Sequence, residues 1–94
     1  MVVDFDPAKD ATNRDKHGVP LAFGARVFED VDVAIVPTVR IGDEAERFKA
    51  VGLVDGKLWT PIHVWRGVVV RMISVRRSNA GEQKDYDRDP GGPE

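Results

Sequence analysis

Two turn signals in the second half of the chain, Asp55-Gly56 and Arg66-Gly67, separate three runs rich in β-branched and aromatic residues. Asp-Gly is a strong signal for a two-residue hairpin loop, because such loops need positive φ angles that these residues tolerate, and Arg-Gly is a weaker one. The spacing therefore predicts an antiparallel meander of three strands, over residues 46–54, 57–65 and 68–76.

This meander would sort its side chains onto two faces, because successive residues of a strand point to opposite sides. With two-residue loops, Val54 pairs with Lys57, and Trp65 pairs with Val68. The first face then holds Glu46, Phe48, Ala50, Trp59, Pro61, His63, Trp65, Val70, Met72, Ser74 and Arg76. The second holds Arg47, Lys49, Val51, Leu53, Leu58, Thr60, Ile62, Val64, Val69, Arg71, Ile73 and Val75. The second face is more uniformly aliphatic, so we expect helices to cover it and the first face to be the working one. Pro61 favours an irregularity in the middle strand, and a bulge would move residues between the two faces.

Helix signals lie on both sides of the meander. At Asp6-Pro7 an aspartate cap precedes proline at the first helical position, and the helix that begins there should stop at His17-Gly18. Apolar residues at helical spacing predict a second short helix that ends before Glu29-Asp30. Ser78 is placed to cap a final helix. Further short strands are expected over residues 2–5 and 34–39.

The predicted elements fit one small α+β domain over residues 1–88, in which the meander packs against two N-terminal helices and a C-terminal helix follows. Pro37 favours an edge position for its strand, because proline lacks the N–H that a central strand needs. Polar residues 40–44 predict a mobile loop, and the Pro- and Gly-rich residues 89–94 predict a disordered tail.

The composition limits the cellular compartment in which this chain is expected and the kinds of molecule that it is expected to bind. The 94 residues include no cysteine, and neither a signal peptide nor a run of membrane-spanning length is evident, so we expect a cytoplasmic protein. The formal net charge is -2, yet the stretch from Lys57 to Arg77 holds five bases and no acid. Such a local basic patch attracts phosphates, although accidental clustering on an ordinary charged surface explains it equally well.

Side chains suited to binding a phosphate and to transferring a proton gather in the meander. His63 is the best group for proton transfer, since its ordinary pKa lies near neutrality, although a lone strand histidine is more often structural. Arg76 can hold a phosphate with two parallel hydrogen bonds, or instead pair with Glu46 or Glu82. Glu46 is also a candidate general base.

Arg71 and Lys49 pair across the middle strand and form a cationic row with Arg47 nearby. If helices cover that face the row is structural, and if the faces are reversed it becomes the phosphate site. Lys49, Lys57, Arg66 and Arg77 are candidates for binding the phosphates of a nucleic acid, and Trp59 and Trp65 are able to stack unpaired bases. Core packing or a protein interface is an equally good role for the two tryptophans. Without a His/Asp cluster at ligand spacing we expect no metal site, and no cofactor is expected.

The order and spacing of several motifs resemble the BrnT-type toxins over nearly the whole chain up to Tyr86. These motifs are Asp6-Pro7-Ala8-Lys9, Asn13 with Lys16-His17-Gly18-Val19, Glu46-Arg47-Phe48, Gly52, Arg66-Gly67, the strand Arg71-Met72-Ile73-Ser74-Val75-Arg76, and Glu82 with Tyr86. The resemblance implies a RelE-like α+β fold and a ribonuclease toxin of a type II toxin-antitoxin pair. With that function, the candidate residues above would bind RNA and cleave it without a metal, and His63, Arg76, Arg71, Arg47 and Glu46 are the candidate catalytic residues. The resemblance also implies a heteromeric complex with a BrnA-type antitoxin. In that complex the antitoxin binds DNA, and the toxin contacts DNA only through it.

Two other functions stay open. One is a binding module that keeps the fold and the antitoxin contact without catalysis, suggested by His63, Pro61 and the acidic tail. The other is a DNA-binding regulator, which the sequence supports least because no recognition helix is evident. A working face with two exposed tryptophans would in each case predict a tight protein partner.

Overall fold

The computed structural model describes residues 1–38 and 46–88. The elements, in chain order, are β1 (Val2–Asp4), α1 (Pro7–His17), the 3-10 turn η1 (Leu21–Phe23), α2 (Gly24–Val27), β2 (Ala34–Pro37), β3 (Phe48–Val54), β4 (Lys57–Arg66), β5 (Val69–Arg77) and α3 (Ala80–Asp87). The predicted α+β class is confirmed. The predictions for residues 40–44 and 89–94 fall outside the described residues. No helix among the described residues has the length and apolarity that crossing a bilayer requires.

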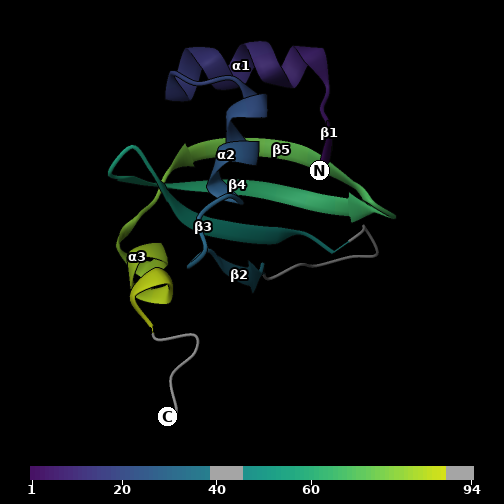
Figure 1. Cartoon of the computed structure of the whole chain (residues 1–94). Helices are drawn as coiled ribbons and strands as arrows, with labels where there is room; N and C mark the ends of the chain where they lie inside the picture. Colours follow the sequence, from purple (N-terminus) through teal and green to yellow (C-terminus); the bar gives the residue numbers. More distant parts are fainter. Residues whose placement is uncertain (39–45, 89–94) are drawn as a thin grey trace.

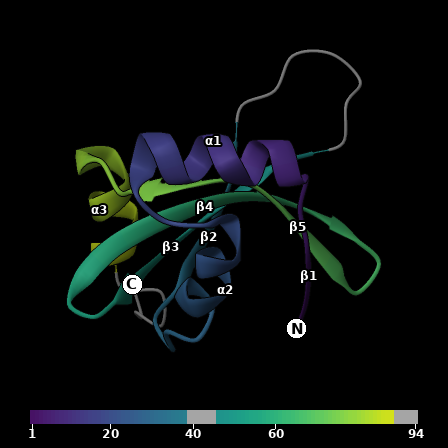
Figure 2. The same cartoon turned by 90° about the horizontal axis from the view of Figure 1, so that it is seen from above.

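A five-stranded sheet in the order β1-β5-β4-β3-β2 forms the centre of the fold. The meander β3-β4-β5 and the edge strand β2 are antiparallel, whereas β1 pairs with β5 in parallel. Helix α1 runs along the β5 side of the sheet (Figure 1). Helices α2 and α3 lie on opposite sides of the strands (Figure 2), and α3 packs near β3 and β2. One sheet face is therefore covered by η1 and α2, and within residues 1–38 and 46–88 the other face carries α3 at one end.

One of the two predicted hairpin loops is confirmed. At Asp55-Gly56 both residues have positive φ, 52° and 81°, and Val54 pairs with Lys57. The second prediction is wrong by one residue, because the loop consists of Gly67-Val68 and Arg66 pairs with Val69. Gly67 takes the first loop position with a φ of 61°, which glycine adopts at little cost.

A β-bulge in β5 changes which side chains share a face. Ile62 pairs with Ser74, but the next residue of β4, His63, pairs with Met72, so Ile73 is an extra residue in the ladder. Such a residue reverses the alternation beyond it. Ser74 and Arg76 consequently lie on the opposite face from Met72, contrary to the predicted register.

The predicted choice of the covered face is wrong. Buried Val70, Met72 and Val75 pack with Leu21 and with Phe23, Phe28 and Trp59 under the N-terminal helices. A neighbouring cluster holds Val27, Ala50 and Val54. The face with the aromatic side chains is covered because η1 and α2 supply two phenylalanines to it, and burial of large aromatic surfaces is the stronger stabilising term. The exposed two-tryptophan surface that suggested a partner does not exist as predicted.

Two glycines allow α2 to lie close against the sheet. A Cβ at Gly52 would lie 2.8 Å from the Val27 carbonyl oxygen, and one at Gly24 would lie 3.0 Å from side-chain atoms of β4 and β5. The predicted second helix is split at Gly24 into the turn η1 and the four-residue α2. Close packing of short helices thus replaces the single longer helix that the sequence indicated.

Helix α1 follows its prediction closely. Asp6 caps it by accepting a hydrogen bond from the Ala8 N–H, and Gly18 ends it with a φ of 78°. Buried Asn13 holds it to the sheet: its Nδ2 donates to the carbonyls of Val75 (2.9 Å) and Val19 (2.8 Å), and its Oδ1 accepts from the Val75 N–H (2.9 Å). The Asn13 amide therefore makes the two backbone hydrogen bonds to Val75 that a neighbouring strand would make at the edge of β5.

Candidate active site

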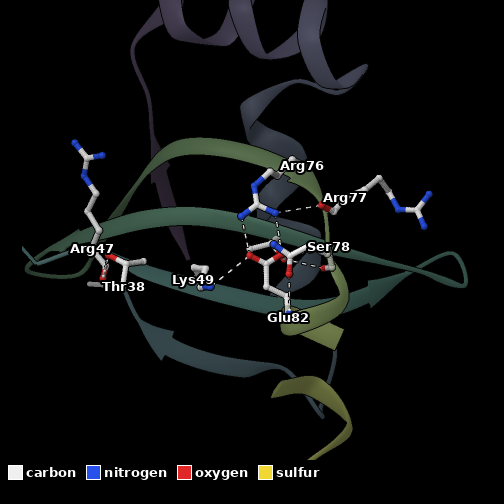
Figure 3. Close-up of polar contacts among 9 residues, drawn as sticks. Thr38, Arg47, Lys49, Arg76, Arg77, Ser78 and Glu82 are labelled. Atoms are coloured by element: carbon white, nitrogen blue, oxygen red, sulfur yellow. Dashed lines mark hydrogen bonds and ion pairs between the residues drawn. The ribbon is translucent and has the colours of Figure 1, made fainter. Parts of the chain in front are cut away.

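A buried carboxylate, Glu82, lies at the centre of a polar cluster on the face opposite α2. Its side chain is 1% exposed. Arg76 donates to both carboxylate oxygens, at 2.8 and 2.7 Å, which is the bidentate geometry of a strong arginine–carboxylate pair (Figure 3). The Lys49 ammonium lies 3.4 Å from Oε2, and the Thr60 hydroxyl donates to Oε1 at 3.0 Å. We call these four residues, Lys49, Thr60, Arg76 and Glu82, the Glu82 cluster.

The sheet register and a helix cap bring the Glu82 cluster together. Thr60 and Arg76 are direct cross-strand partners on β4 and β5, and Lys49 comes from β3 on the same face. Glu82 reaches them from the first turn of α3, where it accepts from the Asn79 N–H while the Asn79 side chain accepts from the Glu82 N–H. This capping box is the N-cap of α3, so the predicted cap at Ser78 is wrong. Ser78 instead shares a hydrogen bond of 2.7 Å with Thr60.

The charges of the cluster control the protonation of Glu82. Burial by itself would raise the pKa of this carboxyl, but the hydrogen bonds from Arg76, Asn79 and Thr60 and the positive charge of Arg76 outweigh it and lower the pKa from 4.5 to about 2. The hydrogen bond to Glu82 likewise raises the pKa of Arg76. The cluster therefore keeps two cations and one anion at neutral pH, and its net charge is positive.

The low pKa of Glu82 predicts a specific loss of stability in acid. In the unfolded chain the Glu82 carboxyl is protonated below its ordinary pKa of 4.5, whereas in the folded chain it stays ionised down to about pH 2. The ionised Glu82 therefore contributes its full stabilisation of the fold above about pH 5, and this contribution is lost as the pH falls to about 2. Between about pH 5 and pH 2 the free energy of unfolding should fall by on the order of 3 kcal/mol more in the wild type than in Glu82→Gln. Urea denaturation at a series of pH values measures this difference, and parallel curves for the two proteins would contradict it.

Further cations border the Glu82 cluster. Figure 3 shows Arg47 and Arg77 on either side of it, with guanidinium groups that point away from Glu82. The Arg77 guanidinium lies over the Trp59 ring, 5.6 Å from its centroid. Arg71 lies on β5 two residues before Ile73, the extra residue of the bulge, and forms an ion pair with Asp4 of β1. Arg77 lines a depression of about 370 Å³ between α3 and the β3–β4 hairpin, together with Lys57. The cationic row of the sequence prediction therefore lies on the open face.

A comparison with protein families identifies the chain. The model of a family described as the ribonuclease toxin, BrnT, of type II toxin-antitoxin systems matches residues 5–82. The chain belongs to this BrnT family. The match spans every member of the Glu82 cluster and confirms the resemblance seen in the sequence motifs. Type II systems pair each toxin with an antitoxin, so family membership implies an antitoxin partner. A search of curated proteins found no match.

His63, the predicted proton-transfer residue, lies on the covered face of this BrnT-family sheet. It is fully buried, with its ring 4.9 Å from that of Phe28 in a T-shaped contact. Nδ1 is 3.3 Å from the Pro61 carbonyl oxygen, and Nε2 has no hydrogen-bond partner among the described residues. Burial lowers the pKa of His63, which favours the neutral ring. The side chain is therefore separated from the Glu82 cluster by the sheet.

The remaining predicted residues lie at several places. Trp59 packs against Phe23 at 4.9 Å under the helices, and Trp65 is 44% exposed on the same side, so neither shares the face of the Glu82 cluster. Arg66 is exposed at the β4–β5 hairpin, and Glu46 is exposed just before β3. Of the predicted site residues, the structure brings Lys49 and Arg76 into direct contact with one carboxylate.

Sequence reasoning missed the central place of Glu82 and any role for Thr60 and Asn79. The sequence predicted Glu82 as one of two possible ion-pair partners of Arg76 and as part of a family motif with Tyr86. A signal was available in the Asn79-x-x-Glu82 spacing, which is that of a capping box and would have oriented this carboxylate. Its burial, in contrast, depends on α3 folding back onto the sheet, which no local pattern specifies.

Proposed function

We propose that this chain is an endoribonuclease that cleaves RNA without a metal ion, inhibits translation in the cytoplasm and is neutralised by a BrnA-type antitoxin. Under this proposal the toxin contacts DNA only through the antitoxin. The observation that supports it most is the Glu82 cluster, which gathers two cations on the open sheet face of a chain that belongs to a ribonuclease toxin family.

Metal-free RNA cleavage requires stabilisation of the charge that develops on the phosphate oxygens as the 2′-hydroxyl attacks. Arg76 uses three N–H donors for Glu82 and the Arg77 carbonyl, so two of its five N–H groups stay available for a phosphate. Lys49 spends one contact on Glu82 and retains further donors. In this proposal both cations bind the scissile phosphate, with Arg47 and Arg71 adding to the positive field.

Glu82 serves a positioning role in this proposal. A carboxyl with a pKa of about 2 is a weak base at neutral pH, because Arg76 holds its charged form. Its bidentate hydrogen bonds instead orient the guanidinium, so that little rearrangement is needed when substrate binds. Glu46, the predicted general base, is exposed just before β3, three residues and thus about 10 Å along the chain from Lys49, whereas a general base acts within hydrogen-bond reach. In this proposal Lys49 and Arg76 stabilise the developing charge, and Glu46 lies outside the phosphate site.

The test is cleavage of a labelled single-stranded RNA by the purified chain in excess EDTA, with and without the protein encoded by the neighbouring gene. We expect cleavage that survives chelation and stops with the partner. The double variant Lys49→Met, Arg76→Ala, purified identically, controls for contaminating ribonuclease. Cleavage that EDTA abolishes would contradict metal independence. Intact RNA in every arm, with the partner still bound, would favour the alternative of a binding module that has lost catalysis.

A further inference from the structure

A second basic depression lies between α1 and β5, outside the Glu82 cluster. It has a volume of about 230 Å³ and is lined by Lys9, Thr12, Asn13, Lys16, His17, Ile73 and Ser74. Two of these residues are lysines, one is a histidine, and none is acidic. We call this depression the α1–β5 groove.

The two lysines of α1 that border the groove lie on a different side of the helix from the buried Asp10. Lys9, Thr12 and Lys16 stand at helical spacing on the stripe that borders the groove, as positions i, i+3 and i+7 do. Buried Asp10 faces away from it, where it accepts from the Leu21 N–H at 2.7 Å and pairs with Arg14. No carboxylate of the described residues forms an ion pair with Lys9 or Lys16. The groove therefore presents cations that the fold leaves uncompensated.

The bulge in β5 connects this groove to the Glu82 cluster. Ser74 and Arg76 share a face, two residues and thus about 7 Å apart along the strand, and the extra residue Ile73 puts that face on the side of the Glu82 cluster. Ser74 also pairs with Ile62, which pairs with Lys49 across the sheet. Helix α1 runs beside this part of β5 (Figure 1), and Asn13 fixes it there through Val75. The open face thus continues into the groove.

We infer that the α1–β5 groove binds backbone phosphates of single-stranded RNA next to the phosphate held by Lys49 and Arg76. The inference rests on the proposed function, since it extends the RNA path from that site. A polyanion matches the groove, because phosphates are attracted to lysines that have no competing carboxylate, and hydroxyl groups such as that of Ser74 commonly contact them. Ordinary backbone contacts carry no base information, so the groove adds affinity and leaves base preference to other contacts.

The experiment measures RNA binding separately from cleavage. Labelled RNAs of about three and about ten nucleotides, made uncleavable by 2′-O-methylation, are titrated with Lys9→Gln, Lys16→Gln in EDTA at several salt concentrations, with fluorescence anisotropy as the readout. For the longer RNA we expect Kd to rise about tenfold and the slope of log K against log salt to shrink by roughly 1.4, as for the loss of two single-strand phosphate contacts. The shorter RNA should bind like wild type, since it does not extend beyond the Glu82 cluster.

The matched control is Arg14→Gln, Arg26→Gln, which removes the same charge from exposed positions outside the groove. It should change Kd by less than about twofold. Glutamine is a good helix former, so all variants should melt like wild type. Equal Kd values for the two double variants, or weakened antitoxin binding with unchanged RNA binding, would overturn the inference while the cleavage proposal stands. RNA binding that depends on Lys9 and Lys16 without any cleavage would support the groove and remove the proposed ribonuclease activity.

Discussion

Replacing Arg76 by alanine should lower the rate of RNA cleavage by about two to three orders of magnitude, the usual effect of removing one preorganised donor to a transition-state oxyanion. The guanidinium is half-buried, already oriented by two hydrogen bonds to Glu82, and retains donors for a phosphate. Lysine at this position would keep the charge but lose the planar fork, so Arg76→Lys should recover only part of the rate. Single-turnover cleavage of a labelled RNA measures both variants.

Arg14→Ala is the matched control, because Arg14 also pairs with a carboxylate, Asp10, but lies on the side of α1 away from the Glu82 cluster. Its cleavage rate should equal that of wild type. Arg76→Ala also leaves Glu82 short of its strongest partner, so its fold must be checked by circular dichroism and by binding to the antitoxin. A folded Arg76→Ala protein that cleaves RNA at the wild-type rate would move the phosphate site away from the Glu82 cluster, toward the Arg47 and Glu46 end of β3.

Replacing Asn13 by alanine should lower the free energy of unfolding by about 4 kcal/mol, because two buried backbone groups and one part-buried carbonyl lose their hydrogen bonds at once. These groups are the Val75 N–H, the Val75 carbonyl and the Val19 carbonyl. Since a small domain has only about 5–15 kcal/mol of stability in total, this one substitution removes a large part of it. Urea denaturation followed by far-ultraviolet circular dichroism measures the change.

Thr12→Ala is the control for this prediction, since Thr12 is the preceding residue of α1 and its hydroxyl makes only an exposed hydrogen bond of 3.2 Å to the Ala8 carbonyl. Its loss should cost under about 1 kcal/mol. Equal effects of the two substitutions would mean that Asn13 does not hold α1 to β5. In that case α1, which forms one side of the α1–β5 groove, would not be held in place by Asn13.

One hairpin turn and both ends of α1 were predictable because their chemistry is local, whereas the N-cap of α3 is Asn79 and not the predicted Ser78. The Asp55-Gly56 hairpin, the Asp6 cap and the Gly18 end of α1 each depend on the φ angle or side-chain oxygen of one or two residues. The second hairpin was misplaced by one residue, since Gly67 has its positive φ at the first loop position and the prediction had put glycine at the second.

Pro61 indicated an irregularity in the meander, but the sequence did not place the extra residue at Ile73, and that position changes which residues form the candidate site. Without that extra residue, Arg76 and His63 shared a predicted face, and a histidine-assisted reaction followed naturally. With it, Arg76 points to the open face while His63 remains under Phe28. A bulge depends on how neighbouring strands twist and pair, and β-branched residues such as Ile73 fit a regular strand equally well.

The sequence by itself determined the family, the α+β class, the meander and the cationic residues, because motif spacing, periodicity and turn chemistry are properties of short segments. The tertiary structure decided which sheet face is open, that Glu82 is buried between Lys49 and Arg76, and that α1 forms a groove with β5. These features depend on free-energy differences between alternative packings of the same segments. Phe23 and Phe28 favour the observed packing, because they cover the aromatic face of the sheet. The cations of β3 and β5 therefore lie on the other face.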